Sequence, residues 1–360
     1  MKILIVTYSV AYGGAERQVI IDANSLSAAG HEVAIVYYAK GDLINSLSAN
    51  VKRYRLKSKN HILASLQLFC YLLFNKFDII HCHLIWAEIV AALPGKITGH
   101  KVIFNEHGLD LWRRRHYVLI SRFIFLFADK IVASCEAIRK VISEREKPRK
   151  DKLVVIYTSF DRKKDKNKEE DIPEFLKSKK EFTIGFVGRF DAIKRLKLFV
   201  DIAEQLKGKI PAFKIVLVGD GAERLRIIDE MQKRNLSEYF YLSGTVPDVN
   251  PYYAAFDVFV LPSLREGASV ALLEAGASGI PAIAFDVGGN PELIQDGVTG
   301  YIIPFNNITL LTDRIVELYG NKDKRKTMSL SAGDFVKNNF STAVRIEKLI
   351  NLYNEVISNA

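Results

Sequence analysis

The sequence has 360 residues, of which 49% are hydrophobic, so it is long and apolar enough for two domains and too apolar for a disordered chain. Its formal charge of +10, from 51 Lys and Arg against 41 Asp and Glu, favours an anionic partner: nucleic acid, a phosphorylated sugar or an acidic membrane surface. Zinc-finger spacing, an RNP-like aromatic strand and a basic helix with heptads are all absent from the sequence, which argues against nucleic acid.

The start of the sequence and its cysteines favour the cytoplasm. A strand pattern begins directly after Met1 without a signal-peptide core, and no apolar run approaches the ~20 residues needed to cross a bilayer. Cys70, Cys82 and Cys135 are odd in number, lie in apolar segments and form no C-x-x-C pair, as expected in a reduced compartment. We expect a cytoplasmic protein, either soluble or attached to the inner face of the cell membrane.

The first half of the chain alternates between strand and helix patterns. Strands are predicted at residues 3–8, 31–37, 78–83 and 101–106, and helices at residues 15–29, 62–74 and 87–97. Gly30 is expected to end the first helix. This alternation predicts a doubly wound parallel sheet, and therefore an α/β fold.

The same alternation resumes after Phe182. Strands are predicted at residues 183–187, 215–218, 239–242, 258–261 and 282–285, and helices at residues 196–206, 222–234 and 270–277. Two Rossmann-like units of this kind imply a ligand-binding cleft.

A change in composition predicts where the domains divide. Residues 161–170 read DRKKDKNKEE, a run of charge that cannot form a core. We therefore predict an N-terminal domain at 1–160, a charged linker at 161–180 and a C-terminal domain at 181–341. The last segment, 342–360, carries apolar residues at helical spacing and predicts a final helix.

The turn between the strand at 258–261 and the helix at 270–277 carries the strongest functional signal. Ser269 can cap the helix, and the backbone amides at its start can bind an anion. Glu266 lies in the turn, and Glu274 lies roughly 7 Å further along the helix axis. A ligand with phosphates at the helix start and hydroxyl groups that donate to each carboxylate would fit this layout, and a nucleotide sugar has these groups. The alternative is a pair of solvated surface acids, but Glu274 lies among apolar residues, where an unpaired carboxylate costs several kcal/mol. The amides expected to contact the phosphates belong to Gly267, Ala268, Ser269 and Val270.

This pattern resembles a known family. Glu266 and Glu274 are spaced like the Glu-x7-Glu signature of the retaining glycosyltransferases of family four, and the similarity continues through Pro281 and residues 288–292 and 296–300. The resemblance covers nearly the whole chain and is strongest in its C-terminal half. It implies the GT-B architecture: two Rossmann-like domains facing a cleft, with the donor on the second domain and the acceptor on the first. It also implies that the C-terminal helix crosses back to the first domain; packing on the second domain is the alternative.

Two cations follow the first strand of the second domain. Gly188 and Arg189 come directly after it, and Lys194 follows five residues later, so that both side chains could neutralise a diphosphate as it binds and as it leaves. The element resembles the family's Gly-Arg-x4-Lys, with one departure: Arg195 stands where the family often has Gly. The segment containing Gly244 and Thr245 resembles the family's base-binding segment, which implies backbone contacts with the nucleotide base.

Candidate ligand-binding residues of the first domain also follow its strands. Gly13 and Gly14 precede the first helix, where paired glycines allow unusual backbone angles and close approach of a ligand. Their spacing is not G-x-G-x-x-G, which weakens a dehydrogenase interpretation; the turn resembles the family's Gly-Gly-Ala-Glu turn, which faces the donor phosphates and the acceptor. His107 follows the strand at 101–106, where α/β sheets bind ligands. The resemblance implies that it contacts the donor sugar near the reacting carbon.

No metal site is predicted. His81 and His83 share one face of a strand, but no third ligand is evident, and no Asp-x-Asp motif occurs to hold a metal-bound diphosphate. Arg189, Lys194 and the helix-terminal amides are expected to serve instead.

One segment suggests contact with an anionic membrane. The basic run from Arg113 to His116 leads into the apolar residues 117–120, then Arg122 and the apolar residues 123–127. A buried helix with a solvated basic turn explains the segment equally well.

We therefore predict a retaining glycosyltransferase that moves a sugar from a nucleotide diphosphate sugar, with a UDP-sugar favoured, to a hydroxyl acceptor. The acceptor is expected to be a saccharide or lipid-linked saccharide of bacterial surface polysaccharide synthesis, and no cofactor is expected. Arg189 and Lys194 are assigned to the leaving diphosphate and His107 to positioning the sugar. Glu274 is assigned to the ribose hydroxyls and Glu266 to the sugar hydroxyls.

The sequence contains no obvious nucleophile, and the resemblance implies a same-face displacement in which a donor phosphate oxygen takes the acceptor proton. Two alternatives stay open: a nucleotide-sugar epimerase on this architecture and a non-catalytic nucleotide-sugar binding module. They are left open by four residues that depart from the family's usual pattern: Thr158, Ser159, Ala268 and Ser269.

Overall fold

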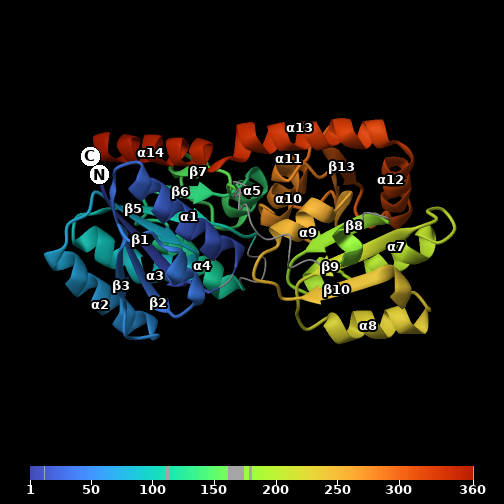
Figure 1. The fold of residues 1–360 in the computed structure, drawn as a ribbon. Helices are drawn as coiled ribbons and strands as arrows, with labels where there is room; N and C mark the ends of the chain where they lie inside the picture. Colours follow the sequence, from blue (N-terminus) through green and yellow to red (C-terminus); the bar gives the residue numbers. More distant parts are fainter. Residues whose placement is uncertain (12, 110–113, 161–173, 178–180, 360) are drawn as a thin grey trace. The chain divides into compact units, whose positions relative to one another are not determined.

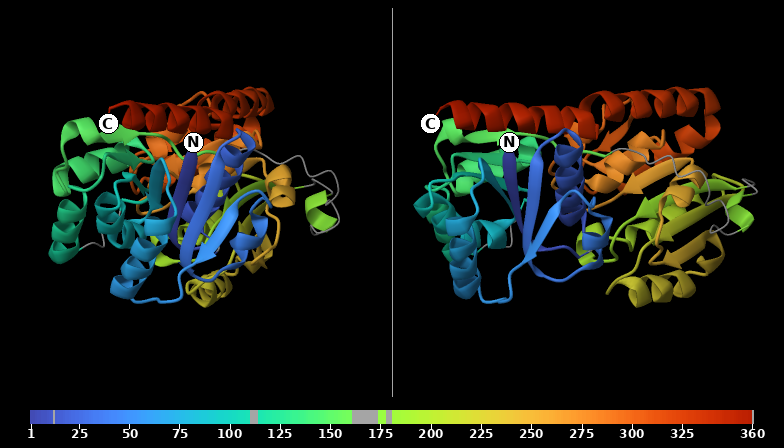
Figure 2. Two further views of the ribbon diagram at one scale, coloured as in Figure 1. Left: turned by 90° about the vertical axis from the view of Figure 1, so that its left-hand side faces the viewer. Right: turned by 60° about the vertical axis from the view of Figure 1, so that its left-hand side comes forward.

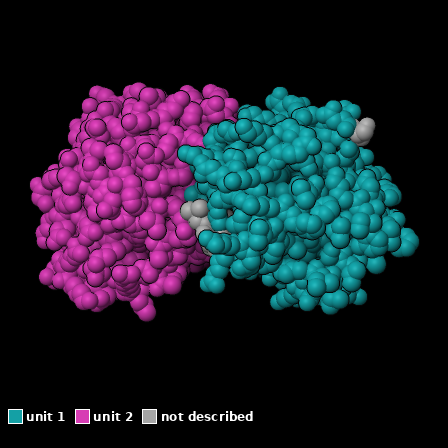
Figure 3. Space-filling view, turned by 180° about the vertical axis from the view of Figure 1, so that it is seen from behind, with its two compact units in different colours: residues 1–159, 342–360 teal, residues 160–341 magenta. Residues whose placement is uncertain are grey.

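The computed structural model describes residues 1–11, 13–109, 114–160, 174–177 and 181–359. The chain forms two compact units, the first made of Met1–Ser159 with Thr342–Ala360 and the second of Phe160–Ser341 (Figures 1 and 3). Of the linker predicted at 161–180, the structure describes only residues 174–177, which form the short helix α6 (Glu174–Lys177) rather than an extended linker; the charged run at 161–170 lies outside the described residues.

Unit 1 is built on a parallel sheet of seven strands in the order β3-β2-β1-β4-β5-β6-β7. Its strands are β1 (Lys2–Ser9), β2 (Glu32–Ala39), β3 (Lys52–Arg55), β4 (Ile79–His83), β5 (Lys101–Glu106), β6 (Lys130–Ala133) and β7 (Leu153–Val155). Its helices are α1 (Gly14–Ala28), α2 (His61–Phe74), α3 (Ile85–Ile97), α4 (Arg115–Ile124), α5 (Glu136–Arg145) and α14 (Thr342–Ser358), with short 3-10 turns η1 (Asp42–Ser46) and η2 (Lys150–Lys152). The four predicted strands are present, and β3, β6 and β7 were not predicted.

The final helix completes the core of unit 1. Side chains of α14, including Leu349 and Tyr353, are fully buried with residues of β1 and of α1, such as Val19. In the ribbon views α14, at the red end of the colour scale, lies beside α1 (Figures 1 and 2). The chain therefore returns to its first unit, and the alternative that this helix packs on the second unit is wrong.

The other helices of unit 1 lie on the opposite face of the sheet. The connections from β3 to β4, from β4 to β5 and from β5 to β6 run in one direction along the sheet, and right-handed crossovers therefore place α2, α3 and α4 on the same face. Contacts join α2 to α3 and α3 to α4. No helix among the described residues is long and apolar enough to cross a membrane. Cys82 and Cys135 are buried, and Cys70 is exposed on α2 among apolar side chains that include Leu66 and Phe74.

Unit 2 repeats this topology in a parallel sheet of six strands in the order β10-β9-β8-β11-β12-β13. Its strands are β8 (Phe182–Val187), β9 (Phe213–Val218), β10 (Phe240–Gly244), β11 (Val258–Leu261), β12 (Ala282–Phe285) and β13 (Gly300–Ile303). Its helices are α6 (Glu174–Lys177), α7 (Leu198–Leu206), α8 (Arg224–Lys233), α9 (Asn250–Ala255), α10 (Val270–Ala277), α11 (Asn290–Leu293), α12 (Ile308–Gly320) and α13 (Lys322–Phe340), with 3-10 turns η3 (Ala192–Lys194) and η4 (Ser237–Tyr239).

The strand order fixes where each unit can bind a ligand. In both sheets the order reverses beside the first strand, between β1 and β4 in unit 1 and between β8 and β11 in unit 2. The loops that leave two such neighbouring strands diverge to opposite faces, which opens a crevice at their carboxyl ends.

Candidate functional site

The loops after β8 and β11 meet at the strand-order reversal of unit 2. The Leu264 amide, after β11, donates a hydrogen bond to the Ile193 carbonyl, after β8, at 2.8 Å. Asp191 stabilises the first loop because its carboxylate accepts hydrogen bonds from the amides of Ile193 and Lys194 at the start of η3. The two loops thus form a single rigid support for the side chains they carry.

The two loops bring Lys194 and Glu266 together. The Lys194 ammonium donates to a Glu266 carboxylate oxygen at 2.6 Å, and the two side chains are 20% and 11% exposed. The Gly289 amide donates to the Glu266 carbonyl at 3.3 Å, which fixes the backbone beneath this carboxylate. A predicted phosphate-binding cation and a predicted sugar-binding acid are therefore partners in one largely buried pair, each with hydrogen-bonding capacity left for a ligand.

The helix that follows Glu266 begins where the sequence predicts. Ser269 occupies the N-cap of α10 in an extended conformation, but its side chain makes no capping hydrogen bond, which corrects that expectation. The amides at the start of α10 therefore donate no hydrogen bond to the Ser269 hydroxyl. Gly267 and Ala268 form the bend before Ser269, and Val270 is the first residue of the helix.

Glu274 is buried in α10 and is held there by a hydrogen bond. Its residue surface is 4% exposed, and its carboxylate accepts a hydrogen bond from the Tyr253 hydroxyl at 2.9 Å. Burial with a partner rules out the interpretation of Glu274 as a solvated surface acid. Its position is set by Tyr253, which reaches it from α9.

Close packing of glycine backbones shapes the carboxyl ends of β8, β9 and β10. The Gly219 amide donates to the Gly244 carbonyl at 3.0 Å, and a Cβ on Gly219 would lie 2.0 Å from the Gly188 carbonyl oxygen. Gly188, Gly219 and Gly244 have φ angles of +157°, +133° and +71°, the last two well inside the region that favours glycine. Thr245 follows Gly244 on the surface. The sequence analysis missed Gly219 and Gly221, although a Gly-x-Gly between a strand and a helix is a recognisable signal.

The other two basic residues of this region have different roles. Arg189 is 79% exposed and pairs with Asp191 at 3.0 Å, so it remains available to a ligand approaching from solvent. Arg195 has a φ of +52°, which explains why glycine suits this position. Its guanidinium donates to the Asn306 side chain at 2.6 Å and lies 5.3 Å from the centre of the Phe305 ring. Arg195 is therefore held away from the Lys194 pair by contacts of its own.

In unit 1, the predicted glycines adopt ordinary conformations. Gly13 is the N-cap of α1 with φ −170° and ψ 160°, which any residue adopts, and Gly14 is the first residue of the helix. The expectation of unusual backbone angles is therefore wrong for both. A side chain on Gly13 would instead meet the Glu16 carboxylate, since its Cβ would lie 2.2 Å from the Glu16 Oε2 atom. The Glu16 carboxylate is the end of a flexible side chain that can move aside, so the structure sets no strict requirement for glycine at this position.

His107 is half-buried and lies beside buried polar side chains at the carboxyl ends of β4, β5 and β6. Its Nε2 atom lies 2.9 Å from the Nδ1 atom of His83, and its Nδ1 atom lies 3.4 Å from the Ser134 hydroxyl. Burial, followed by the nearby Arg345 guanidinium, lowers the pKa of His107 to about 3, so the ring is neutral at neutral pH. A ligand would therefore meet a neutral imidazole rather than a positive charge at His107.

A buried ion pair that the sequence analysis missed supports these polar side chains. Arg345 of α14 donates two hydrogen bonds to the Asp22 carboxylate of α1 at 2.8 and 2.7 Å, and the side chains are 1% and 0% exposed. Arg345 also donates to the Asn105 side chain at 3.0 Å, and Asn105 donates to the Ser134 hydroxyl at 3.1 Å. The hydrogen bonds therefore continue from α14 to the serine beside His107.

Among the described residues, no group of three potential ligands could hold a metal ion. His81 and His83, the pair considered for a metal, have other contacts: His81 lies 2.7 Å from the Tyr353 hydroxyl and His83 lies against His107. Burial lowers the pKa of His81 to about 3 and that of His83 well below its usual value. Both histidines are thus neutral components of the unit 1 interior.

Two family models match this chain. The model described as "Glycosyltransferase Family 4" matches residues 12–164, and "Glycosyl transferases group 1" matches residues 167–333. The chain is a family-four glycosyltransferase. The matched segments contain all of the predicted site residues, with His107 in the first and Lys194, Glu266 and Glu274 in the second.

This glycosyltransferase resembles curated relatives over most of its length. It is 27% identical to N-acetyl-alpha-D-glucosaminyl L-malate synthase of Bacillus anthracis, over 78% of this chain and 74% of the relative. It is 26% identical to UDP-Gal:alpha-D-GlcNAc-diphosphoundecaprenol alpha-1,3-galactosyltransferase of Escherichia coli, over 79% of this chain and 77% of the relative. The glycosyltransferase is thus an enzyme related to bacterial polysaccharide and lipid-linked glycosyltransferases.

Solved structures identify its architecture. Anabaena HepE, determined in complex with UDP, matches with a TM-score of 0.86 at 19% identity, over 99% of this chain and 100% of that chain. The glycosyltransferase therefore has the GT-B architecture, with two Rossmann-like domains built on parallel sheets.

Proposed function

We propose that this glycosyltransferase transfers a sugar from a UDP-sugar to a hydroxyl of a saccharide or lipid-linked saccharide, with retention of configuration and without a metal ion. The observation that carries the donor assignment is the pair of Lys194 and Glu266 at the strand-order reversal of unit 2. The names of the relatives support the substrate classes, because one acts with UDP-Gal on a diphosphoundecaprenol-linked sugar and HepE was determined with UDP.

The Lys194–Glu266 pair gives the donor a site that is already charged and partly dehydrated. A diphosphate beside Lys194 would take up the remaining ammonium donors, and sugar hydroxyls would donate to the free lone pairs of Glu266. Neither side chain would have to lose much water when the donor binds, since both are already largely buried. Arg189, exposed on the same loop, would add charge as the diphosphate leaves. This arrangement supplies the positive charge that a divalent ion would otherwise provide.

The two acids of unit 2 would act as hydrogen-bond acceptors. Glu266 already accepts from Lys194 and Glu274 from Tyr253, which suits contacts with the sugar and the ribose better than nucleophilic attack. The amides of Ser269 and Val270 would face the phosphates, and the backbone of Gly244 and Thr245 would face the base. The acceptor proton would pass to a donor phosphate oxygen, and His107 would contact the transferred sugar as a neutral imidazole.

Attachment to the inner face of the cell membrane is part of this proposal. On α4 and just after it, Leu119, Phe123 and Leu126 are 61%, 62% and 70% exposed, and the basic residues Arg115 and Arg122 of the same helix are exposed too. A fully buried helix does not fit these exposed side chains. Arg113 lies outside the described residues.

The donor assignment is tested by binding and by transfer. Thermal shifts with UDP, GDP, ADP and UDP-sugars should show stabilisation by UDP and its sugars. Lys194→Met and Glu274→Gln should each weaken UDP-dependent stabilisation and transfer by ~10–100-fold, as loss of a charge-assisted contact does. Glu274→Gln keeps an acceptor for Tyr253, so folding should be preserved.

The matched control is Lys207→Met, an exposed lysine in the same unit, which should behave as the parent protein. Transfer should survive EDTA, and NMR of the product should show the donor's anomeric configuration. Undiminished binding and transfer in both site variants would overturn the assignment, and conversion of the donor without an acceptor product would indicate an epimerase.

A further inference from the structure

The most exposed side chains of helix α2 in unit 1 are all apolar. Its sequence, HILASLQLFCYLLF, contains no charged residue, and Asn60 caps its start by accepting hydrogen bonds from two backbone amides. Ala64, Leu68 and Leu72 are fully buried on the inner side of the helix. Six residues are exposed, and all are apolar: Ile62, Leu63, Leu66, Cys70, Leu73 and Phe74.

The exposure of these side chains is large. Ile62 is 73% exposed, Leu66 56% and Phe74 87%. An ordinary surface helix carries polar residues on its outer face, and a helix that is apolar all round is normally buried in protein or lipid. Contiguous exposed apolar surface of this kind marks a site of interaction. The outer face of α2 therefore requires a partner.

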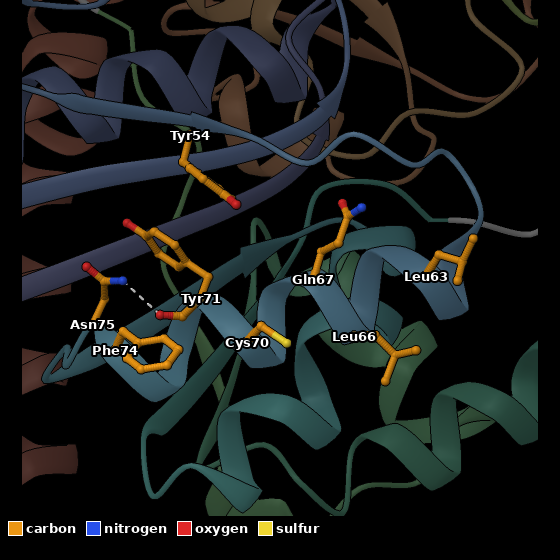
Figure 4. Close-up of a pocket in the computed structure, with 8 residues that line it drawn as sticks. All are labelled: Tyr54, Leu63, Leu66, Gln67, Cys70, Tyr71, Phe74 and Asn75. Carbon is orange, nitrogen blue, oxygen red and sulfur yellow. Dashed lines mark hydrogen bonds between the residues drawn. The ribbon is translucent and has the colours of Figure 1, made fainter.

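The neighbouring strand extends this apolar surface into a groove. Tyr54 of β3 stacks on Tyr71 of α2 with ring centres 4.4 Å apart, and the groove beside them has a volume of about 520 Å³. Leu63, Leu66 and Phe74 line it along α2 (Figure 4). Tyrosine rings with apolar neighbours suit the boundary between water and lipid, because each ring combines an apolar body with a polar hydroxyl.

The charges around α2 indicate what the partner is. Residues 43–77 contain no Asp or Glu. They contain six basic residues: Lys52, Arg53, Arg55, Lys57, Lys59 and Lys76. Such a segment attracts an anionic surface, with about 1 kcal/mol for each Lys or Arg near an anionic bilayer. A second copy of the same face would bring like charges together and is disfavoured.

Further apolar side chains lie on the same face of the unit 1 sheet. Leu93 and Ile97 of α3, which packs against α2, are 50% and 62% exposed. From the sequence, membrane contact is predicted only for the segment at 113–127 and not for α2.

We propose that the outer face of α2, with the groove beside Tyr54, inserts into the surface of an anionic lipid bilayer and is the principal membrane-docking site of the enzyme. This inference deepens the proposed function by placing membrane attachment on a defined surface, and it does not depend on the identity of the donor. Apolar side chains would enter the boundary between headgroups and acyl chains, and the flanking lysines would pair with lipid phosphates.

Co-sedimentation of the full-length protein with vesicles tests this proposal. The parent protein should bind vesicles of phosphatidylcholine with phosphatidylglycerol, should bind phosphatidylcholine alone weakly, and should lose binding as salt is raised. The double variant Leu66→Ser, Phe74→Ser and the double variant Lys57→Glu, Lys59→Glu should each lower the partition coefficient by about tenfold or more. The matched control is Leu225→Ser, an apolar side chain of unit 2 that is 79% exposed and should have no effect.

The results separate membrane docking from the donor chemistry. Stabilisation by UDP, measured without vesicles, should be the same in all of these variants and in the parent protein. Vesicle binding that is unchanged in both double variants would overturn the proposal. Equal binding to vesicles with and without phosphatidylglycerol would also overturn it. A parent protein that is dimeric in solution and becomes monomeric in the α2 variants would also overturn it, because the face would then be covered by a second copy.

Discussion

Replacement of Arg345 by Met should destabilise unit 1 strongly. Arg345 and Asp22 are almost fully buried, and Arg345 also donates hydrogen bonds to the carbonyls of Ile156 and Tyr157 at 3.1 and 2.8 Å. Removing the guanidinium leaves the Asp22 carboxylate charged and buried, and the Gln18 amide, 2.8 Å away, is then its one side-chain donor among the residues that the structure describes. Breaking a buried pair in this way costs about 3–5 kcal/mol.

The cost can be measured by scanning calorimetry of the full chain. For a unit of this size each kcal/mol lowers the melting temperature by roughly 2–4 °C, so the transition of unit 1 should fall by about 6–20 °C. The double variant Asp22→Asn, Arg345→Met removes both charges and should be clearly more stable than the sum of the single changes predicts. Arg226→Met is the matched control, because its pair with Glu223 is on the surface and is worth less than about 1 kcal/mol.

Two results would refute this reasoning. A loss below about 1 kcal/mol in Arg345→Met would mean that Asp22 is not left as an unpaired buried charge. Additive effects of the two changes would mean that Asp22 and Arg345 stabilise unit 1 independently.

Two further predictions concern the sheet ends. The Cβ of Gly219→Ala would lie 2.0 Å from the Gly188 carbonyl oxygen, so this change should lower the free energy of unfolding by about 3 kcal/mol. Gly99 has a φ of +77° but nothing within 4 Å of an added Cβ, so Gly99→Ala should lower it by only about 1 kcal/mol. Equal melting temperatures of the two variants would contradict this prediction. The lowered pKa values of His81 and His107, each about 3, and of His83 mean that the unfolded chain takes up protons below pH 6.5 that the folded chain does not. Stability of unit 1 should therefore fall with pH from about 6.5 downward, by about 1.4 kcal/mol per pH unit for each histidine, and a flat profile in urea unfolding would show that the rings are already charged or solvated.

The fold could be predicted because most strands carry a strong local signal. Parallel strands covered on both faces are continuous apolar runs, as in β1 and β8, and such runs are visible without any knowledge of their neighbours. Strand β3 was missed because its sequence is KRYR with all four residues exposed, so that only its pairing with β2 makes it a strand. Tertiary context outweighs local preference there.

The candidate site was predictable only in part. Lys194, Glu266 and Glu274 follow strands in a family pattern, so their residue types and spacing identified them. Asp22 and Arg345 are 323 positions apart, and neither has a neighbour in the sequence that indicates a buried partner. The backbone conformations of single residues could not be predicted from the sequence either. Gly13 has an extended backbone although an unusual conformation was expected, and Arg195 has a left-handed backbone conformation although it is not glycine.

The return of α14 to unit 1 sets an order of events during synthesis on the ribosome. The strands of the first sheet leave the exit tunnel early, but Asp22 has no arginine to neutralise it until the last segment of the chain has been translated. Throughout the synthesis of unit 2 the nascent first unit therefore exposes the apolar surface that Leu349 and Tyr353 will cover. A ribosome stalled shortly before residue 342 should hold a first unit that is readily cleaved by protease, and a nascent chain in which α14 has left the exit tunnel should be protected.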